Sequence, residues 1–110
     1  MERVAAERIL RLIGLGVRSR NVVVGVEQVR EAARKGKLAF AIVAPDASIN
    51  SRDKIVPLLR ARGIKFVEGP TAAELGAAVG REQTAAVGVL DAQLARGIGE
   101  LAEANAARNS

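Results

Sequence analysis

The side chains of this chain that could do chemistry are few, and their types exclude most catalytic sites. The sequence contains no Cys and no His, so disulfides, thiolate and imidazole metal sites, and Cys- or His-based nucleophilic catalysis are excluded. The helix-start carboxylates ordinarily complement the helix dipole, and they are scattered along the chain at Glu27, Glu31, Asp46, Asp53 and Glu74. We therefore expect no enzymatic activity, no metal and no cofactor.

The stretch best suited to binding a ligand is "VVVGVEQVREAARKGK", in which a β-branched run ends at Gly25 and a helical pattern follows. Free amides at a helix N-terminus bind anions, and a residue without Cβ lets a nucleic-acid backbone come close. Gln28, on the first turn, can donate to and accept from a base edge. A plain strand-to-helix turn with a solvated basic face is an equally compatible interpretation of this stretch.

The charge of the chain favours nucleic acid as a partner. Its 110 residues carry 17 Lys and Arg against 12 Asp and Glu, a net charge of +5, and a basic small domain is typical of nucleic-acid binding. Aromatic residues make up only 2%, so contacts must come from backbone, charge and small side chains. The cations that follow Gly25 are predicted to contact phosphates, and they are Arg30, Arg34, Lys35 and Lys37.

The sequence gives no sign of a membrane or secretory segment. No apolar run is long enough to span a bilayer, and Arg3, Arg8 and Arg11 interrupt the region where a secretory signal would need apolar residues. We expect a cytoplasmic monomer that has no membrane partner.

Two periodicities alternate along the chain and predict the elements that position these residues. Apolar residues at helical spacing predict helices within residues 1–20, 26–35, 53–62, 71–79 and 92–104. Short β-branched or apolar runs predict strands within residues 21–25, 37–45, 64–69 and 84–91. Thr71 and Glu74 form a predicted capping box at the start of the fourth helix. Residues 105–110 are expected to be frayed.

Pro57 constrains where the third helix begins. Proline is tolerated in the first turn, where amides have no intrahelical partner. The sequence therefore predicts a helix start near Asp53, among the capping residues Asn50, Ser51 and Asp53. If the helix begins earlier, we expect Pro57 to kink it.

Strands that alternate with helices behind a leading helix predict an α/β fold. We expect one domain over residues 1–104, built as a three-layer α-β-α sandwich around a mostly parallel four-stranded sheet. The loop Pro45–Ser48 should lie at the same sheet end as Gly25, where open α/β sheets bind ligands. The segment Gly80–Ala86 joins them only if the fourth strand runs antiparallel.

The ordered segments "VVVGVEQV", "AFAIVAPDAS", "KIVPLLRARGIKFVEG", "TAAELGAAVG" and "TAAVGVLD" resemble the L7Ae/L30e superfamily of ribosomal proteins. The bacterial YlxQ-like branch is the most similar. The resemblance extends from about Leu12 to Leu90 and depends on an ordered set of positions: Gly25, Gly36, Asp46, Pro57-Leu58-Leu59, Leu75-Gly76 and Gly80. It implies an α-β-α sandwich with a four-stranded mixed sheet.

The resemblance also implies binding of structured RNA of the kink-turn type, in which tandem sheared G·A pairs flank a sharp bend. Family members dock the helix start into the groove at those pairs, which implies contacts at Gly25, Val26, Glu27, Gln28 and Glu31. Loop residues cover nucleotides outside the bend, which implies contacts at Asp46, Ala47, Ser48, Gln83, Thr84, Ala85 and Ala86. The implied protein is a non-catalytic RNA binder, either ribosome-associated or a relative of ribosomal proteins.

Glu27, Gln28 and Glu31 depart from the pattern of archaeal and eukaryotic relatives, which have Asn-Glu and then a Lys one turn later. The exchange of a cation for a carboxylate should weaken phosphate attraction by about 1 kcal/mol at low salt. Glu27 can still accept from a guanine amino or imino group. The alternative function is a protein–protein interaction module on the same scaffold, because fold does not fix function.

Two substitutions follow from this interpretation. A β-branched residue in place of Gly25 is expected to abolish RNA binding and leave the fold intact, because it would cover the helix start. Lys35→Ala is expected to weaken binding modestly through the loss of one phosphate contact.

Overall fold

The computed structural model describes residues 1–109 and contains five helices and four strands. The helices are α1 (Arg3–Arg18), α2 (Val26–Arg34), α3 (Ile49–Ala61), α4 (Ala72–Ala78) and α5 (Ala92–Asn109). The strands are β1 (Val22–Val24), β2 (Phe40–Val43), β3 (Phe66–Glu68) and β4 (Ala86–Val89). The predicted order of helices and strands is confirmed.

The four strands form one mixed sheet in the order β1-β4-β2-β3. β4 runs antiparallel to both β1 and β2, and β2 runs parallel to β3. Val24 at the end of β1 pairs with Val87, and Val43 at the end of β2 pairs with Ala86. The ends of β1, β2 and β3 therefore lie at the same end of the sheet as the beginning of β4.

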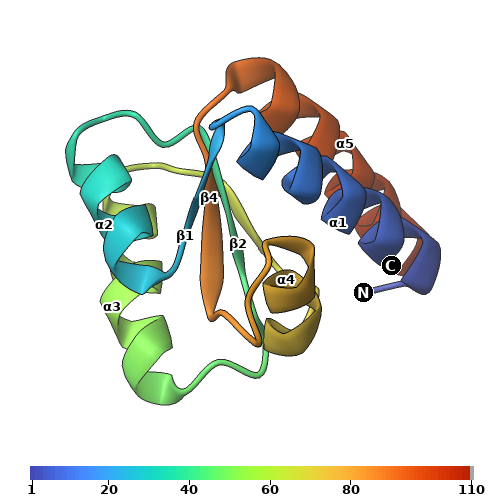
Figure 1. Ribbon diagram of the computed structural model, residues 1–110, viewed down its shortest axis with the longest axis horizontal. Helices are drawn as coiled ribbons and strands as arrows, with labels where there is room; N and C mark the ends of the chain where they lie inside the picture. The colour runs from blue at the N-terminus through green and yellow to red at the C-terminus, as the bar shows by residue number, and fades with distance from the viewer. Residues whose placement is uncertain (110) are drawn as a thin grey trace.

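Helices cover both faces of this sheet (Figure 1), which confirms the predicted three-layer sandwich. On one face α1, α4 and α5 bury Ile9, Leu75 and Ile98 against Ile42 of β2. On the other face α2 and α3 pack against Val43, the next residue of β2. Successive strand residues point to opposite faces, so β2 is buried on both sides, as its continuous apolar run predicts.

The third helix begins earlier than predicted. α3 starts at Ile49 and its N-cap is Ser48, whose hydroxyl accepts a hydrogen bond from the Ser51 amide at 3.1 Å. Pro57 therefore lies inside the helix, and the expected start near Asp53 is wrong. Pro57 removes one hydrogen bond, to the carbonyl of Asp53. Both residues are exposed, so water can solvate that carbonyl.

The last helix also extends further than predicted. α5 continues to Asn109, so residues 105–109 are helical where a frayed segment was expected, and Ser110 lies outside the described residues. The amide of Glu2 donates to the side-chain oxygen of Asn105 at 2.9 Å. This bond joins the last turns of α5 to the beginning of α1. Among the helices of residues 1–109, none has the length and apolar character required to cross a bilayer.

The predicted capping box at the start of α4 is confirmed. The Thr71 amide and hydroxyl each donate to the Glu74 carboxylate at 3.0 Å, and the Glu74 amide donates to the Thr71 hydroxyl at 3.3 Å. The bonds from Thr71, first its amide and then its hydroxyl, lower the pKa of the Glu74 carboxyl below its ordinary value of 4.5.

A lowered pKa contributes stability above pH 4.5 that is lost as the pH falls through the folded-state value, because the unfolded carboxyl is protonated first. The glutamine side chain of Glu74→Gln cannot titrate. We therefore expect the unfolding free energy of this variant to fall less than that of the wild type as the pH falls below 4.5. Urea denaturation midpoints across an acidic pH series measure the difference. Parallel pH profiles for the two proteins would contradict the role given to Glu74.

Candidate nucleic-acid interface

The junction between β1 and α2 has a backbone conformation that requires glycine. Gly25 has φ 96° and ψ 159°, a region that residues with a Cβ essentially never occupy. An ideal Cβ at this position would have no atom within 4 Å. Glycine is therefore required by the backbone, and the space in front of it is open.

The free donors at this junction are the three amides that follow the glycine. The Gly25 amide donates to the Ala86 carbonyl at 2.9 Å, so Gly25 itself offers no donor. The next amide with an acceptor is that of Val29, which donates to the Gly25 carbonyl at 3.0 Å. No side chain caps α2. Within residues 1–109 the amides of Val26, Glu27 and Gln28 have no acceptor and remain available to a ligand.

Three segments meet at this end of the sheet because β4 is antiparallel. They are Gly25–Gln28, Asp46–Ser48 and Gln83–Ala86, and we call them together the loop end. The Gly25 amide bonds the Ala86 carbonyl, and the Ala44 amide donates to the Ala85 carbonyl at 2.8 Å. The sequence analysis expected the third segment to join the other two only if the fourth strand runs antiparallel, and it does.

Asp46 and Ser48, two predicted contact residues, hold the fold together with their side chains. The Asp46 carboxylate accepts a hydrogen bond from the Ala72 amide at 2.9 Å, at the N-terminus of α4. Ser48 caps α3. Asp46 therefore fixes the loop after β2 to α4, and it carries a structural task that the sequence interpretation did not give it.

Asp46→Ala is expected to lower the unfolding free energy by about 1 kcal/mol, because the Ala72 amide loses its acceptor. RNA affinity is expected to fall as well, since the Asp46–Ser48 loop is no longer tied to α4. Asp53→Ala, which removes an exposed carboxylate that has no ion pair among residues 1–109, is the control for net charge. Equal denaturation midpoints for the two variants would contradict this assignment.

The segment before β4 presents fewer side chains than predicted. Thr84 is 8% exposed and Ala86 is fully buried, and the Thr84 hydroxyl donates to the Ala86 carbonyl at 3.2 Å. Their side chains are buried, so the contacts predicted at these two positions would have to come from the backbone. Gln83 is exposed and Ala85 is half-buried.

Three of the four cations that follow Gly25 in the sequence lie far from it in the structure. α2 has nine residues, a length of about 13 Å, so Arg34 at its C-terminus and Lys35 and Lys37 beyond it lie at the opposite end of the sheet. Lys35 forms an ion pair with Glu31 at 3.0 Å, and its hydrogen bond and charge lower the pKa of the Glu31 carboxyl. Arg30 is half-buried, and its Nε has no hydrogen-bond partner among the described residues.

Two exposed residues beside the loop end were missed by sequence reasoning. Ile49 is 78% exposed although it directly follows the capping residue Ser48. Arg81 is exposed in the segment between α4 and β4. The sequence contained a signal for Ile49, since it is an apolar residue immediately after a capping serine. It also contained one for Arg81, which is a cation within the segment Gly80–Ala86 that the sequence analysis had singled out.

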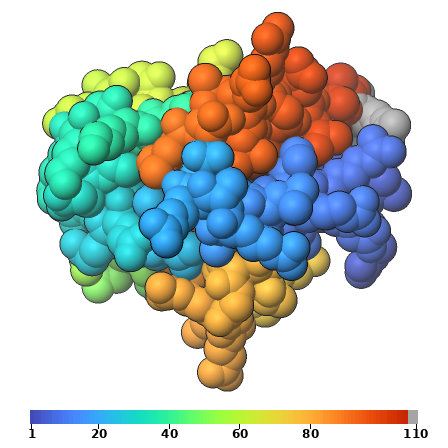
Figure 2. All heavy atoms as spheres, turned by 45° about the horizontal axis from the view of Figure 1, so that its top comes forward, coloured from blue at the N-terminus to red at the C-terminus, as the bar shows by residue number. Residues whose placement is uncertain are grey.

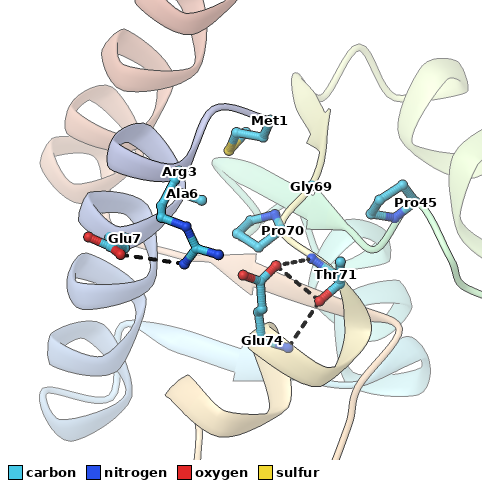
Figure 3. A pocket seen from close by; sticks show the side chains of 9 residues that line it. All are labelled: Met1, Arg3, Ala6, Glu7, Pro45, Gly69, Pro70, Thr71 and Glu74. Carbon is cyan, nitrogen blue, oxygen red and sulfur yellow. Dashed lines mark hydrogen bonds and ion pairs between the residues drawn. The ribbon is translucent and has the colours of Figure 1, made fainter.

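A cavity of about 150 Å³ lies beside the loop end (Figure 3), between the start of α1 and the segments that follow β2 and β3. Its polar groups already have partners, since Glu74 bonds Thr71 and Arg3 pairs with Glu7 at 3.7 Å. Both carboxylates are therefore engaged in contacts within the fold. In the part of the chain that the structure describes, no three potential ligand side chains gather to hold a metal ion.

The chain matches the model of the ribosomal protein L7Ae/L30e/S12e/Gadd45 family over residues 7–98. It is similar to a solved structure of a Bacillus halodurans protein of unknown function, with 29% identity and a TM-score of 0.80 over 86% of this chain and 96% of that one. It also resembles a Giardia lamblia 15.5kD RNA binding protein, with 18% identity and a TM-score of 0.81 over 94% and 92% of the chains. The second likeness shows the fold alone. No curated protein matches the chain.

Proposed function

Because the chain belongs to the ribosomal protein L7Ae/L30e/S12e/Gadd45 family, we propose that it is a non-catalytic RNA-binding protein that recognises kink-turn or similarly bent RNA through the loop end. The observation that carries the proposal is the set of three unpaired amides at Val26, Glu27 and Gln28 behind an open glycine. In this proposal the protein acts as a cytoplasmic monomer.

The helix start supplies the base contacts in this proposal. The three amides can donate to phosphate or base oxygens, and the absence of a Cβ at Gly25 lets the strand approach them. Glu27 and Gln28 are exposed, and a carboxylate accepts from the amino and imino groups of guanine. The Gln28 side chain lies near the Val24 amide at 3.4 Å, a long contact that a base can replace.

The neighbouring segments supply contacts outside the bend. Ala47, Ile49 and Ala85 offer small or apolar surface to an unstacked nucleotide, and Arg81 offers a cation to a phosphate. This arrangement suits a folded RNA strand that passes over α2 and reaches the two loops, because the three segments lie next to one another.

An electrophoretic shift assay tests the proposal. A kink-turn duplex should bind at least about tenfold more tightly than a duplex whose G·A pairs are replaced by Watson–Crick pairs, because one base-specific contact contributes about 1–3 kcal/mol. Equal affinity for the two duplexes would overturn the proposed function.

Glu27→Ala separates base recognition from charge. We expect it to weaken kink-turn binding about tenfold if Glu27 accepts from a base. Glu103→Ala removes the same charge from an exposed position on α5 and should leave the affinity unchanged or slightly higher. If Glu27→Ala tightens binding as much as Glu103→Ala does, Glu27 makes no base contact.

A protein-interaction module on the same scaffold is the second candidate. It is a candidate because a shared fold does not fix function. A simple observation separates the two functions. An RNA binder should carry nucleic acid through purification until a salt wash removes it, whereas the interaction module should purify without nucleic acid.

A further inference from the structure

The end of the sheet opposite the loop end gathers the C-termini of three helices. α1, α2 and α3 lead into β1, β2 and β3, which run parallel to one another because β1 and β2 are both antiparallel to β4. In Figure 2 this end is turned toward the viewer, and the blue segment before β1 lies beside the teal α2 region and the orange segment after β4. We call it the basic end, after its exposed cations Arg18, Arg20, Arg34, Lys35, Lys37 and Arg62.

The positive charge of the basic end is largely uncompensated. Of its six cations, only Lys35 has a carboxylate partner among residues 1–109, namely Glu31. Arg62 donates to the Arg34 carbonyl at 3.2 Å, a bond that leaves its charge in place. The carboxylate of Asp91, which follows β4, accepts from the Leu94 amide at 2.8 Å. A cation at each helix C-terminus complements the helix dipole. This effect does not explain Arg20 and Lys37, which lie beyond the helix ends.

The three helices end in the same hydrogen-bonded turn, and one of the three turns is strained. The amides of Asn21, Lys37 and Ile64 donate to the carbonyls of Gly16, Ala32 and Leu59, each five residues earlier, at 2.7, 3.0 and 2.9 Å. The left-handed residue inside each turn is Arg20 (φ 63°), Gly36 (φ 69°) or Gly63 (φ 65°). Glycine adopts this conformation freely, whereas a residue with a Cβ is strained in it. An arginine therefore stands where a glycine would relax the turn.

We propose that the basic end is a second RNA-binding surface, which holds the phosphate backbone of a double-stranded RNA segment. A strained residue whose side chain has no partner in the fold points to a role outside it, and Arg20 makes no ion pair within the described residues. The three turns lie at the same end of the sheet, where β2 is next to β3 and β4 separates β2 from β1. Together they gather the exposed cations at this end.

The chemistry of this surface favours a phosphate polymer over a protein or a membrane. Protein interfaces and membrane-bound surfaces have apolar anchors among their charges. Among the residues whose exposure the structure describes, the exposed large apolar ones are Met1, Val4, Leu15 and Ile49, and only Leu15, on the last turn of α1, lies near the basic end. With contacts at both ends, one molecule would join two segments of a folded RNA. The inference requires RNA as the partner but does not require kink-turn recognition.

The test measures binding of a straight RNA duplex with only Watson–Crick pairs at several salt concentrations. A triple variant, Arg20→Gln, Arg34→Gln and Lys37→Gln, should bind about tenfold more weakly at low salt and lose about two to three units of salt slope. The matched triple variant, Arg8→Gln, Arg11→Gln and Lys54→Gln, removes three exposed cations elsewhere and should stay within about twofold of the wild type.

Equal weakening by the two triple variants, or none by the first, would overturn the inference. So would binding of polyglutamate or of phosphatidylserine vesicles as tight as that of the duplex, because the surface would then recognise negative charge of any kind. The probe duplex has no bend, so this test does not depend on kink-turn recognition. If the kink-turn assay shows no preference, the proposed function is overturned, but the present test still decides whether the basic end binds RNA.

Arg20→Gly separates binding from folding. The variant should melt a few degrees above the wild type because the turn relaxes, and it should bind the straight duplex more weakly. Arg20→Lys should keep most of the affinity without the gain in melting temperature. A fall in melting temperature for Arg20→Gly, or unchanged duplex binding, would overturn the argument from strain.

Discussion

Gly76→Ala is expected to lower the unfolding free energy by about 3 kcal/mol, although it adds a single methyl group. A Cβ on Gly76 would lie 2.5 Å from the Gln83 Cα, 2.7 Å from the Gln83 nitrogen and 2.9 Å from the Arg81 carbonyl oxygen. All three atoms belong to the backbone, so no side chain can turn away to make room. The segment before β4 must shift or α4 must move, and chemical denaturation measures the resulting loss.

The same variant should also lose RNA affinity, because the segment that shifts leads directly into the loop end. Gly97→Ala is the matched control, since its Cβ would meet only the Leu12 Cδ1, at 3.8 Å, in ordinary contact. Alanine favours the helix over glycine by about 1 kcal/mol, so Gly97→Ala should be neutral or more stable than the wild type. Equal stability of the two variants would show that Gly76 is not held by this contact.

Gly25→Val is expected to reduce kink-turn affinity about 100-fold, which corresponds to about 2.7 kcal/mol. Its side chain would occupy space beside the helix start that is now open, next to the unpaired amides of Val26, Glu27 and Gln28. The sequence interpretation expected an intact fold in this variant, but the backbone predicts otherwise. At φ 96° and ψ 159°, a residue with a Cβ costs about 1–3 kcal/mol of strain.

The strain and the blocked approach can be separated with a second glycine. Gly63 also has a positive φ, 65°, with no atom within 4 Å of an added Cβ, but it lies at the opposite end of the sheet. Gly63→Val should therefore lose stability and keep its preference for the kink-turn duplex over the Watson–Crick duplex. Binding is measured at a temperature where both variants are folded. Equal losses of affinity would mean that strain, and not access to the amides, determines binding.

The fold could be predicted from the sequence because local signals agree with one another. The capping box at Thr71 and the doubly buried run of β2 led directly to the observed α4 and β2. The start of α3 could not be fixed, because Ser48, Asn50, Ser51 and Asp53 are all capable caps and only the tertiary structure selects Ser48. The extension of α5 includes Asn105, which bonds Glu2 at the other end of the chain, a contact that no local pattern shows.

The candidate site was predicted in outline and not in its details. The place of Gly25 between β1 and α2 could be predicted because a glycine ends the β-branched run. The three segments meet because one strand, β4, is antiparallel. The cations were misplaced because spacing along the sequence was treated as closeness in space, whereas α2 carries Arg34 away from Gly25. The role of Asp46 involves Ala72, a partner 26 residues away, which no local pattern shows.

The most direct test of the central claim is a titration of isotope-labelled protein with the kink-turn duplex, followed by amide chemical shifts. The amides of Val26, Glu27 and Gln28 have no acceptor in the free protein, and a new hydrogen bond to RNA should shift them strongly. We predict the largest changes at these three residues, with smaller ones at Ala47 and Ala85. If the three signals stay in place while the duplex binds elsewhere, the account is contradicted.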